Sequence, residues 1–249
     1  VIAAVGQTVP ANEIIIVDNK STDQTPVILR ELQEEFPDAP IIVLQQTEAQ
    51  GITPARNMGF DAVTSDIIGR IDSDSVLEPN WVEETQKVFL DDNVHAATGP
   101  VIYYDMPLRR YMARADDTAR RAMSKLVKQY HFLFGTNMAL RRTSWEAVRG
   151  EICLDADREM HEDIDLSVHL FDDGYNIEDA PKMVAGMSSR RADDSPSDFL
   201  TYVRRFDNTY NHHGLRQAVL RIPQWGYLGI YPLAKSLRWS MKLRESLKR

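Results

Sequence analysis

Hydrophobic and polar positions change their spacing repeatedly along the first hundred residues, which predicts strands and helices in turn. Residues 14–18 form a short run of mainly β-branched apolar side chains, as in strands buried on both faces of a parallel sheet. Turn residues follow, and Thr25-Pro26 supplies a cap and a first-position proline for a helix to about Phe36. Further strands are expected at 41–44, 67–71 and 94–103, and helices at 53–63 and from 79. This order predicts a Rossmann-like, mostly parallel α/β sheet flanked by helices.

The second half of the chain is predicted to be more helical. Residues 107–130 form a helical pattern whose arginines mostly suit a solvated face, with a substrate role as the alternative. We expect a strand at 137–140, a helix from Thr143, and a helix at 162–173 that ends at Asp172-Asp173-Gly174. A polar loop at 190–197 precedes helices that run to the end. The pattern therefore predicts an α/β domain over residues 1–185 and a helical C-terminal extension over 186–249.

Composition narrows the class of protein. The chain has 249 residues, 43% hydrophobic and 27% charged, which suits one large globular domain with a modest appendage. Its single cysteine, Cys153, argues against a disulfide framework and a thiolate zinc site, and is typical of a reducing, cytoplasmic setting. The formal net charge of −8 argues against a nucleic-acid-binding protein. The uncharged stretch Ile222 to Ala234 is too short to span a bilayer.

The last fifteen residues carry the opposite charge to the rest. Lys235 to Arg249 contains six basic residues and one acidic residue. At helical spacing, basic residues share one face (Lys235, Arg238, Lys242, Arg249, with Glu245) and apolar residues share another (Leu233, Leu237, Met241). Such a helix suits the surface of an anionic membrane, at the inner face of the cell membrane. It equally suits a helix packed on the protein body or on a second copy of the chain.

Acidic residues follow two of the predicted strands. Asp18 ends the first strand, and Asp72 and Asp74 follow the strand at 67–71. Because the carboxyl ends of parallel strands meet at one edge, we expect these side chains to face one crevice. Asp18 could accept hydrogen bonds from a nucleobase or ribose, and the other two could hold Mg²⁺ or Mn²⁺ with phosphate oxygens. An Asp-x-Asp triplet alone is weak evidence, since it is also common in ordinary polar turns.

A third acidic pair, Glu162-Asp163, opens the predicted helix at 162–173. The helix dipole and free N–H groups favour ionised carboxylates there, so a capping role is the plain alternative. Next to an acceptor hydroxyl, such a carboxylate could instead act as a general base. A cation would meanwhile offset the charge on a departing diphosphate. Together the three acidic groups indicate nucleotide-sugar chemistry.

The chain resembles the family 2 glycosyltransferases over roughly residues 1–180. The resemblance is carried by six segments in order: Gln7–Pro10, Ile14–Thr25, Gly51 with Pro54–Gly59, Ile71–Asp74, Gly135–Arg142 and His161–Leu166. It implies a GT-A fold and an inverting, single-displacement transfer from a nucleoside-diphosphate sugar to a glycan or lipid-linked acceptor, such as a cell-envelope polysaccharide. It also implies a divalent cation, Mn²⁺ or Mg²⁺.

The resemblance also implies roles for individual residues. Asp163 would be the catalytic base, with Glu162 beside it, and Asp74 together with Asp72 would hold the metal. The donor would contact Asp18, Asn19, Asp23, Arg56, Asp72, Gly135, Thr136 and Asn137. A late histidine, His212, is a further candidate metal ligand, against the alternative of an exposed pair with His213 at a helix end.

The chain departs from the family pattern at its beginning. The family normally starts with a strand that contacts the nucleotide, and we expect that strand to be missing before Val1. The loop at Arg190-Arg191 could close over donor phosphates or be plain surface. Two other readings stay open: a nucleotidyltransferase, although no glycine-rich basic loop is visible, and a catalytically silent nucleotide-sugar-binding module. A homo-oligomer is also compatible with the sequence.

Overall fold

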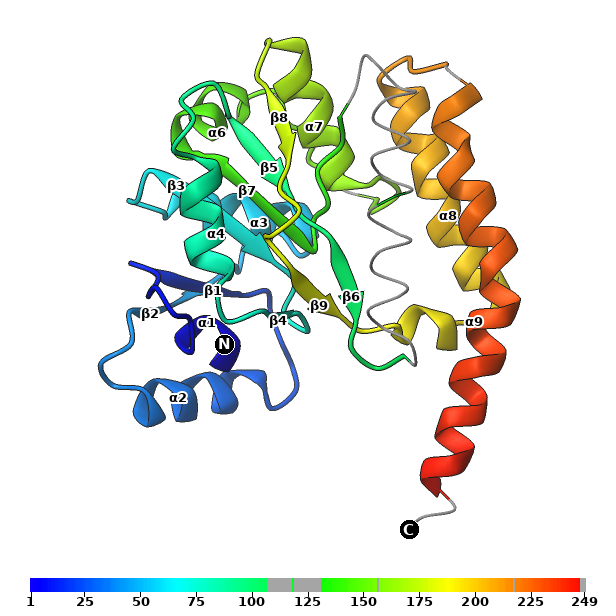
Figure 1. The fold of residues 1–249 in the computed structure, drawn as a ribbon, viewed down its shortest axis with the longest axis horizontal. Coiled ribbons are helices and arrows are strands. Elements are labelled where there is room, and N and C mark those ends of the chain that lie inside the picture. Colours follow the sequence, from blue (N-terminus) through cyan, green and yellow to red (C-terminus); the bar gives the residue numbers. More distant parts are fainter. Residues whose placement is uncertain (107–117, 119–130, 156, 217, 247–249) are drawn as a thin grey trace.

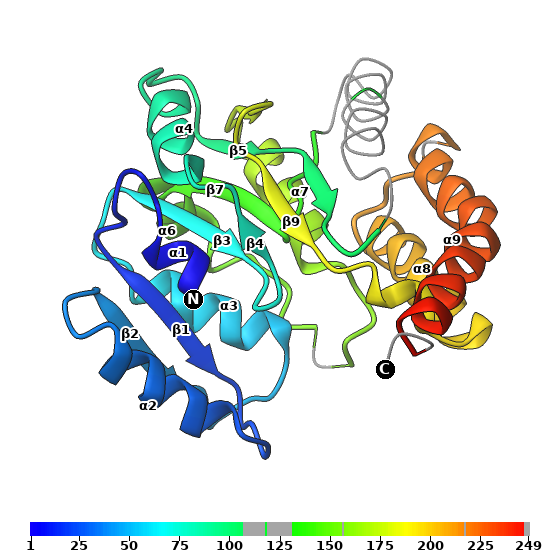
Figure 2. The ribbon, with the colours of Figure 1, turned by 60° about the horizontal axis from the view of Figure 1, so that its bottom comes forward.

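The computed structural model describes residues 1–106, 118, 131–155, 157–216 and 218–246. The predicted helix at 107–130, with its arginines, lies outside the described residues except for Thr118. Figure 1 shows an α/β body with two long C-terminal helices side by side along one flank. Figure 2 shows β1, β2 and α2 at the opposite end of the molecule from those helices. The α/β class and the helical C-terminal region are therefore confirmed.

The central sheet has four strands in the order β3 (Ile67–Ile71), β7 (Asn137–Arg141), β5 (Ala96–Thr98) and β8 (Ile177–Asp179). β7 runs antiparallel to both β3 and β5, whereas β5 and β8 are parallel. β1 (Ile14–Asp18) and β2 (Ile41–Gln45) form a separate parallel pair. The sheet is more mixed than the pattern predicts, because β7 runs antiparallel to both of its neighbours.

A third, small sheet has the order β4 (Val76–Leu77), β9 (Ala185–Met187) and β6 (Val101–Tyr103). The single strand expected at 94–103 is therefore wrong: it divides at Gly99-Pro100 into β5 and β6, which belong to different sheets. A Cβ at Gly99 would lie 1.8 Å from the carbonyl oxygen of Met183, so only glycine permits this close approach. Pro100 has no N–H to continue a ladder.

The remaining bounds follow the sequence pattern closely. The helices are α1 (Ile2–Val5), α2 (Thr25–Glu35), α3 (Ile52–Asp61), α4 (Trp81–Val88), α6 (Arg142–Val148), α7 (Glu162–Asp172), α8 (Pro196–His212) and α9 (Ile222–Ser246), with short 3₁₀ turns η1 (Arg190–Asp193) and η2 (Ala218–Arg221). The loop expected at 190–197 is thus η1 plus the start of α8. Gly174, with a φ of +79°, follows α7 in the left-handed conformation that favours glycine.

Alternate residues of the central strands enter two separate cores. Ile68, Met138 and Leu140 pack against α3, α6 and α7, where Phe60 and Trp145 meet edge to face at 5.1 Å. The intervening residues, with Ala139 as an example, pack instead against α4, β4 and β9. Because side chains alternate along a strand, a residue's parity decides which core it faces. This parity places the polar side chains of the site described below.

The C-terminal helices cover α7. Ile164 and Val168 of α7 pack with Tyr210 of α8 and Leu220 of η2. Two basic residues of α9 face the body: Arg238 Nη1 lies 2.6 Å from an Asp105 carboxylate oxygen, and Lys242 Nζ lies 2.7 Å from Asp193 Oδ2. Of the two interpretations of this basic face, these ion pairs favour a helix packed on the protein body.

α9 also exposes large apolar side chains. Trp225 and Trp239 are 62% and 65% exposed, and Ile230 and Leu233 are exposed as well. No helix within the described part of the chain is long and apolar enough to cross a membrane.

Candidate active site

The aspartates that follow β3 belong to a polar network rather than to an isolated turn. Thr136 Oγ1 donates to Asp72 Oδ2 across 2.9 Å, and Arg70 Nη2 lies 3.2 Å from Asp72 Oδ1. Arg190 Nε lies 3.2 Å from Asp74 Oδ2. The side chains of Asp72 and Asp74 remain 40% and 28% exposed. Two partly exposed carboxylates one residue apart fit the oxygen ligands that a hard divalent cation prefers.

Arg70 joins this turn to the beginning of α7. Its Nη2 lies 2.8 Å from Glu162 Oε1, and Arg56 Nη1 donates to the backbone carbonyl of Glu162 across 2.6 Å. Burial alone would raise the pKa of Glu162, but the guanidinium groups of Arg70 and Arg56 outweigh it and the pKa is lowered. Glu162 is therefore held ionised, and the two arginines tie α7 to β3 and α3.

The neighbouring carboxylate, Asp163, shows the opposite shift. Its Oδ2 accepts a hydrogen bond from the N–H of Gly135 at 2.8 Å, and its Oδ1 accepts one from the N–H of Ile164 at 2.9 Å. Burial, followed by the negative charge of Glu162, raises the pKa of Asp163 to about 6. A carboxylate with this pKa is largely ionised at neutral pH and can still accept a proton. Such a group suits general-base catalysis.

Gly135 leaves the space in which Arg70 lies. A Cβ at this position would lie 1.9 Å from Arg70 Nη1, which no side chain could tolerate without displacing the arginine. Arg70 Nη1 is buried and has no hydrogen-bond partner among the described residues. Glycine at 135 therefore permits the arginine to reach both Asp72 and Glu162.

The predicted acids thus lie close together. Asp72 and Asp163 bond to the consecutive residues Thr136 and Gly135, so the turn after β3 and the start of α7 form one network. Glu162 belongs to the same network, because Arg70 forms ion pairs with both Glu162 and Asp72. We call these residues, with Arg70 and Arg56, the acid–arginine network.

The end of β1 contributes a second group of polar side chains. Asp18 is buried, and hydrogen bonds from Ser21 lower its pKa. Asn19 Nδ2 donates to the carbonyl of Gly51 across 2.6 Å, which leaves its buried Oδ1 without a partner in the described structure. Asp23 Oδ1 accepts the N–H of Thr25 at 2.9 Å, so this exposed carboxylate sits at the start of α2. Among Asp18, Asn19 and Asp23, the buried acceptor without a partner is therefore Oδ1 of Asn19.

α3 connects the β1 group with the acid–arginine network. A Cβ at Gly59 would lie 3.3 Å from Val17 Cγ2, which shows how closely α3 packs on β1. Arg56, on the same helix, is buried, and burial lowers its pKa to about 10. Its Nε and Nη2 contact Asn57 Oδ1 at 3.1 and 2.9 Å. The hydrogen bonds of Arg56 thus go to Asn57 and to the backbone of Glu162, and they position α7.

Asn137 does not face the acid–arginine network. Its side chain is 0% exposed, its Oδ1 accepts from Trp81 Nε1 at 2.7 Å, and its Nδ2 donates to the carbonyls of Met183 and Pro100. The prediction of a direct donor contact is wrong here, because parity in β7 turns Asn137 to the opposite face of the sheet from Thr136. Asn137 instead fixes the connection between β7, α4 and β9.

His212 does not join Asp72 and Asp74 either. Its Nε2 lies 3.1 Å from Cys153 Sγ. Within the described residues, no hydrogen bond or ion pair joins His212 to Asp72 or Asp74. Its role as a metal ligand at that turn stays a prediction.

The sequence pattern did not single out Arg70. It could have been found, because it is a charge inside an otherwise apolar strand, two positions before Asp72 and hence on the same face. Arg190 was predicted either to close over donor phosphates or to be plain surface, and the structure pairs it with Asp74. A cavity of about 900 Å³ lies elsewhere, beside β2 and α3, and includes neither Asp72 nor Asp163 among its lining residues.

Comparisons with known proteins show what this chain is similar to. The chain is 29% identical over 183 residues to the putative glycosyltransferase EpsH of Bacillus subtilis, covering 66% of this chain and 49% of that protein. It is 32% identical over 103 residues to the hyaluronan synthase of Streptococcus pyogenes, covering 39% of this chain and 24% of that protein. The chain thus spans about half or less of the length of these relatives.

A solved structure has the same fold. The mannosyltransferase PcManGT from Pyrobaculum calidifontis, in complex with GDP-Man and Mn²⁺, superposes with a TM-score of 0.64 at 19% identity, over 94% of this chain and 66% of that one. The fold is accordingly of the GT-A type. Residues 1–149 match the family model described as Glycosyl transferase family 2. Because that match covers more than half of the chain, the protein belongs to glycosyl transferase family 2.

Proposed function

We propose that the protein is an inverting glycosyltransferase that moves a hexosyl group from a nucleoside-diphosphate sugar to an acceptor hydroxyl on a glycan or lipid-linked acceptor. The observation that carries this proposal is the connection of Asp72 and Asp163 through the consecutive residues Thr136 and Gly135. It provides one carboxylate for the donor side and one for the acceptor side of a single displacement.

Asp163 is the proposed general base. The acceptor oxygen attacks the anomeric carbon of the donor sugar, the bond from that carbon to the diphosphate oxygen breaks, and the acceptor proton passes to Asp163. Single displacement inverts the anomeric configuration. Glu162 supports this role electrostatically, because its negative charge helps to raise the pKa of Asp163 to about 6. Glu162 itself is engaged by Arg70.

Asp72 and Asp74 are the proposed cation ligands, and their partly exposed carboxylates fit Mn²⁺ or Mg²⁺. A bound cation would offset the negative charge that develops on the departing diphosphate. Arg190, which now pairs with Asp74, is placed to contact donor phosphates once Asp74 binds the cation.

On the nucleotide side, the proposed contacts are Asp18 and Asn19. The vacant Oδ1 of Asn19 supports this assignment, because a buried acceptor without a partner is costly unless a ligand satisfies it. Asp23, at the start of α2, is retained as a weaker donor contact. Arg56 is proposed to position α7 rather than to bind the diphosphate.

Donor screening tests the proposal. Thermal-shift assays with UDP-, GDP-, dTDP- and CMP-sugars and Mn²⁺ should show stabilisation by one donor class, and GDP-mannose is a sound first choice because the structural neighbour binds it. Consumption of that donor then separates an enzyme from the alternative of a silent binding module. Donor binding without hydrolysis or transfer, with any acceptor tested, would favour the silent module.

We also propose that α9 contacts the inner face of the cell membrane through its exposed apolar side, which would suit a lipid-linked acceptor. Trp225 and Trp239, at 62% and 65% exposure, support this orientation. Flotation with phospholipid vesicles should be lost in the Trp225→Ala/Trp239→Ala variant. Equal flotation of the variant and the parent protein would contradict membrane contact. So would a substitution whose only effect is to convert a dimer of the chain to a monomer.

A further inference from the structure

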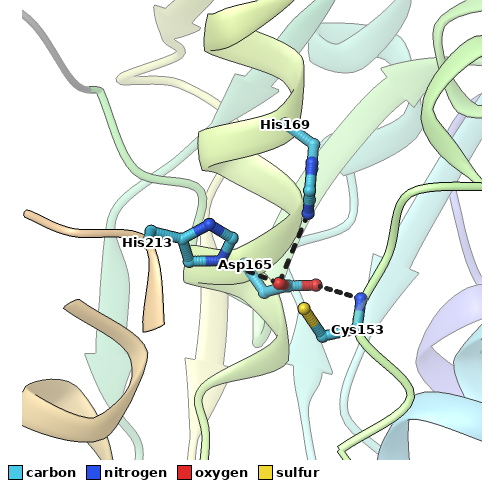
Figure 3. Close-up of side chains that lie close together, drawn as sticks. All are labelled: Cys153, Asp165, His169 and His213. Carbon is cyan, nitrogen blue, oxygen red and sulfur yellow. Dashed lines mark hydrogen bonds and ion pairs between the residues drawn. The ribbon is translucent and has the colours of Figure 1, made fainter. Parts of the chain in front are cut away.

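Four side chains with metal-ligating atoms meet on the side of α7 away from the acid–arginine network. They are Cys153, Asp165, His169 and His213, and their Sγ, carboxylate and ring nitrogen atoms all lie within 4.8 Å of one another. Figure 3 shows the two imidazole rings and the thiol arranged around the Asp165 carboxylate. We call these residues the Cys–His cluster.

Two separations within the Cys–His cluster are close to those of a tetrahedral ion, and the remaining ones stay within 4.8 Å. His213 Nε2 lies 2.9 Å and His169 Nε2 lies 3.6 Å from Asp165 Oδ1. Ligand atoms of a tetrahedral zinc site lie about 3.4 Å apart, given metal–ligand distances of about 2.0–2.3 Å. Adjustments of well under an ångström in these two separations would therefore admit an ion. Asp165 and His169 are four residues apart on α7 and share one helix face.

The bonding within the cluster also leaves room for a ligand. His169 Nε2 is buried and has no hydrogen-bond partner among the described residues, since 3.6 Å to the carboxylate is too long. On the other side of the same ring, Nδ1 lies 3.5 Å from a Glu151 carboxylate oxygen. A metal-bound histidine commonly directs its second nitrogen to such a carboxylate. The vacant Nε2 is therefore the atom that the cluster presents for coordination.

We propose that the Cys–His cluster is a structural site for a borderline-soft divalent ion, with Zn²⁺ as the best fit. One thiolate, two imidazoles and one carboxylate match the ligand types that zinc prefers, whereas Mn²⁺ and Mg²⁺ prefer oxygen. The single cysteine argued against a thiolate zinc site, but the structure supplies the remaining ligands from α7 and from the residue after α8. The site is separate from Asp72 and Asp74.

A zinc ion here would join three separate segments of the chain. Cys153 belongs to the loop after α6, Asp165 and His169 belong to α7, and His213 follows the last residue of α8. Asp165 lies two residues after Asp163, on the other side of the same helix. Zinc would thereby fix the C-terminal region on the helix that carries the proposed base, without touching the reacting atoms.

Cobalt substitution tests this proposal independently of transfer activity. Because the chain contains one cysteine, any thiolate-to-cobalt charge-transfer band must come from Cys153. We expect one tetrahedral Co²⁺ per chain, with intense absorption and the charge-transfer band, both displaced by one equivalent of Zn²⁺, while any Co²⁺ at Asp72 and Asp74 gives no charge-transfer band. Zinc should also raise the melting temperature. The protein is first treated with EDTA and dialysed, and Co²⁺ is then added. Absence of the band after this addition, or a band that forms only when the chain dimerises, would overturn the proposal.

Variants identify the ligands. Cys153→Ser should abolish the charge-transfer band, and His169→Ala and His213→Ala should each weaken Zn²⁺ binding by more than about 100-fold, beyond the effect of losing an outer-shell partner. His169→Gln and His213→Gln preserve volume and serve if the alanine variants fail to fold. His212→Ala is the matched control, since His212 touches Cys153 but lies outside the four. Loss of the band in His212→Ala, or unchanged zinc affinity in both His169 and His213 variants, would overturn the assignment.

Discussion

Asp163 and Asp165 lie on the first turn of one helix, two residues apart, and face two regions with different chemistry. Asp163 belongs to the acid–arginine network, where burial and the charge of Glu162 raise its pKa to about 6. Asp165 belongs to the Cys–His cluster, where burial would also raise its pKa, but hydrogen bonds from His213 and Cys153 outweigh burial and lower it. Two aspartates of one helix thus differ in their chemistry: Asp163 can accept a proton near neutral pH, whereas Asp165 stays ionised.

The difference shows that neighbours, and not the helix terminus, decide what each carboxylate does. The N-terminus of a helix favours ionised carboxylates in general. Asp163 departs from that expectation because it is buried and because Glu162 places a second negative charge beside it, which together raise its pKa. Asp165 follows it because imidazole and thiol groups surround its carboxylate. Catalysis and anchoring can therefore occupy opposite sides of one helix.

The largest expected effect separates the two aspartates directly. Asp163→Asn should lower the transfer rate by about 10²- to 10⁴-fold, the usual contribution of a general base, with donor affinity nearly unchanged. Asp165→Asn should mainly lower the melting temperature and the zinc affinity. Initial rates, donor titrations and thermal denaturation of both variants measure this. Similar rates for Asp163→Asn and the parent protein would remove Asp163 from the role of base.

A smaller effect is expected at Gly135, which belongs to the acid–arginine network. In Gly135→Ala the new Cβ would lie 1.9 Å from Arg70 Nη1, so the arginine must leave Asp72 and Glu162. We expect a loss of about 1–3 kcal/mol in the free energy of unfolding, as for other overpacked sites, together with reduced transfer. Urea denaturation measures the first and initial rates the second.

Gly150→Ala is the matched control for this substitution. A Cβ at Gly150 meets nothing within 4 Å, so the change in unfolding free energy should stay within about 0.5 kcal/mol. Arg70→Ala supplies a second control: if the collision is the cause, the double variant Gly135→Ala/Arg70→Ala should be no less stable than Arg70→Ala alone. Additive losses would show that Gly135 acts in some other way.

The sequence predicted one of the two regions well and the other hardly at all. β3, α2 and α7 were predicted to within a residue or two, because period-two and period-3.6 patterns and turn residues mark them clearly. The convergence of Asp72 and Asp163 followed from their places at a strand end and a helix start. Asn137 was misplaced, since the motif that contains it does not tell which face of β7 each residue occupies.

The Cys–His cluster was beyond prediction for a different reason. Its members come from a loop, from α7 and from the end of α8, and only the packing of α8 on α7 brings His213 to Asp165. No local spacing marks this arrangement except the i, i+4 pair of Asp165 and His169. The sequence analysis named His212 as a candidate metal ligand, whereas the Cys–His cluster contains His213.

The smallest expected effect is a shift along the pH axis. If Asp163 is the base, kcat/KM should rise about tenfold per pH unit below an inflection near pH 6 and level off above it, because the ionised form is active and the pKa of Asp163 is raised to about 6. Glu162→Gln removes the negative charge that helps to raise this pKa and frees Arg70, which lowers it. The inflection should therefore move to lower pH in Glu162→Gln, and Glu34→Gln, on the exposed side of α2, should leave it in place. An inflection that stays near pH 6 in Glu162→Gln, or moves upward, would mean that the titrating group is not coupled to Glu162. The acid–arginine network would then not set the pKa of the base.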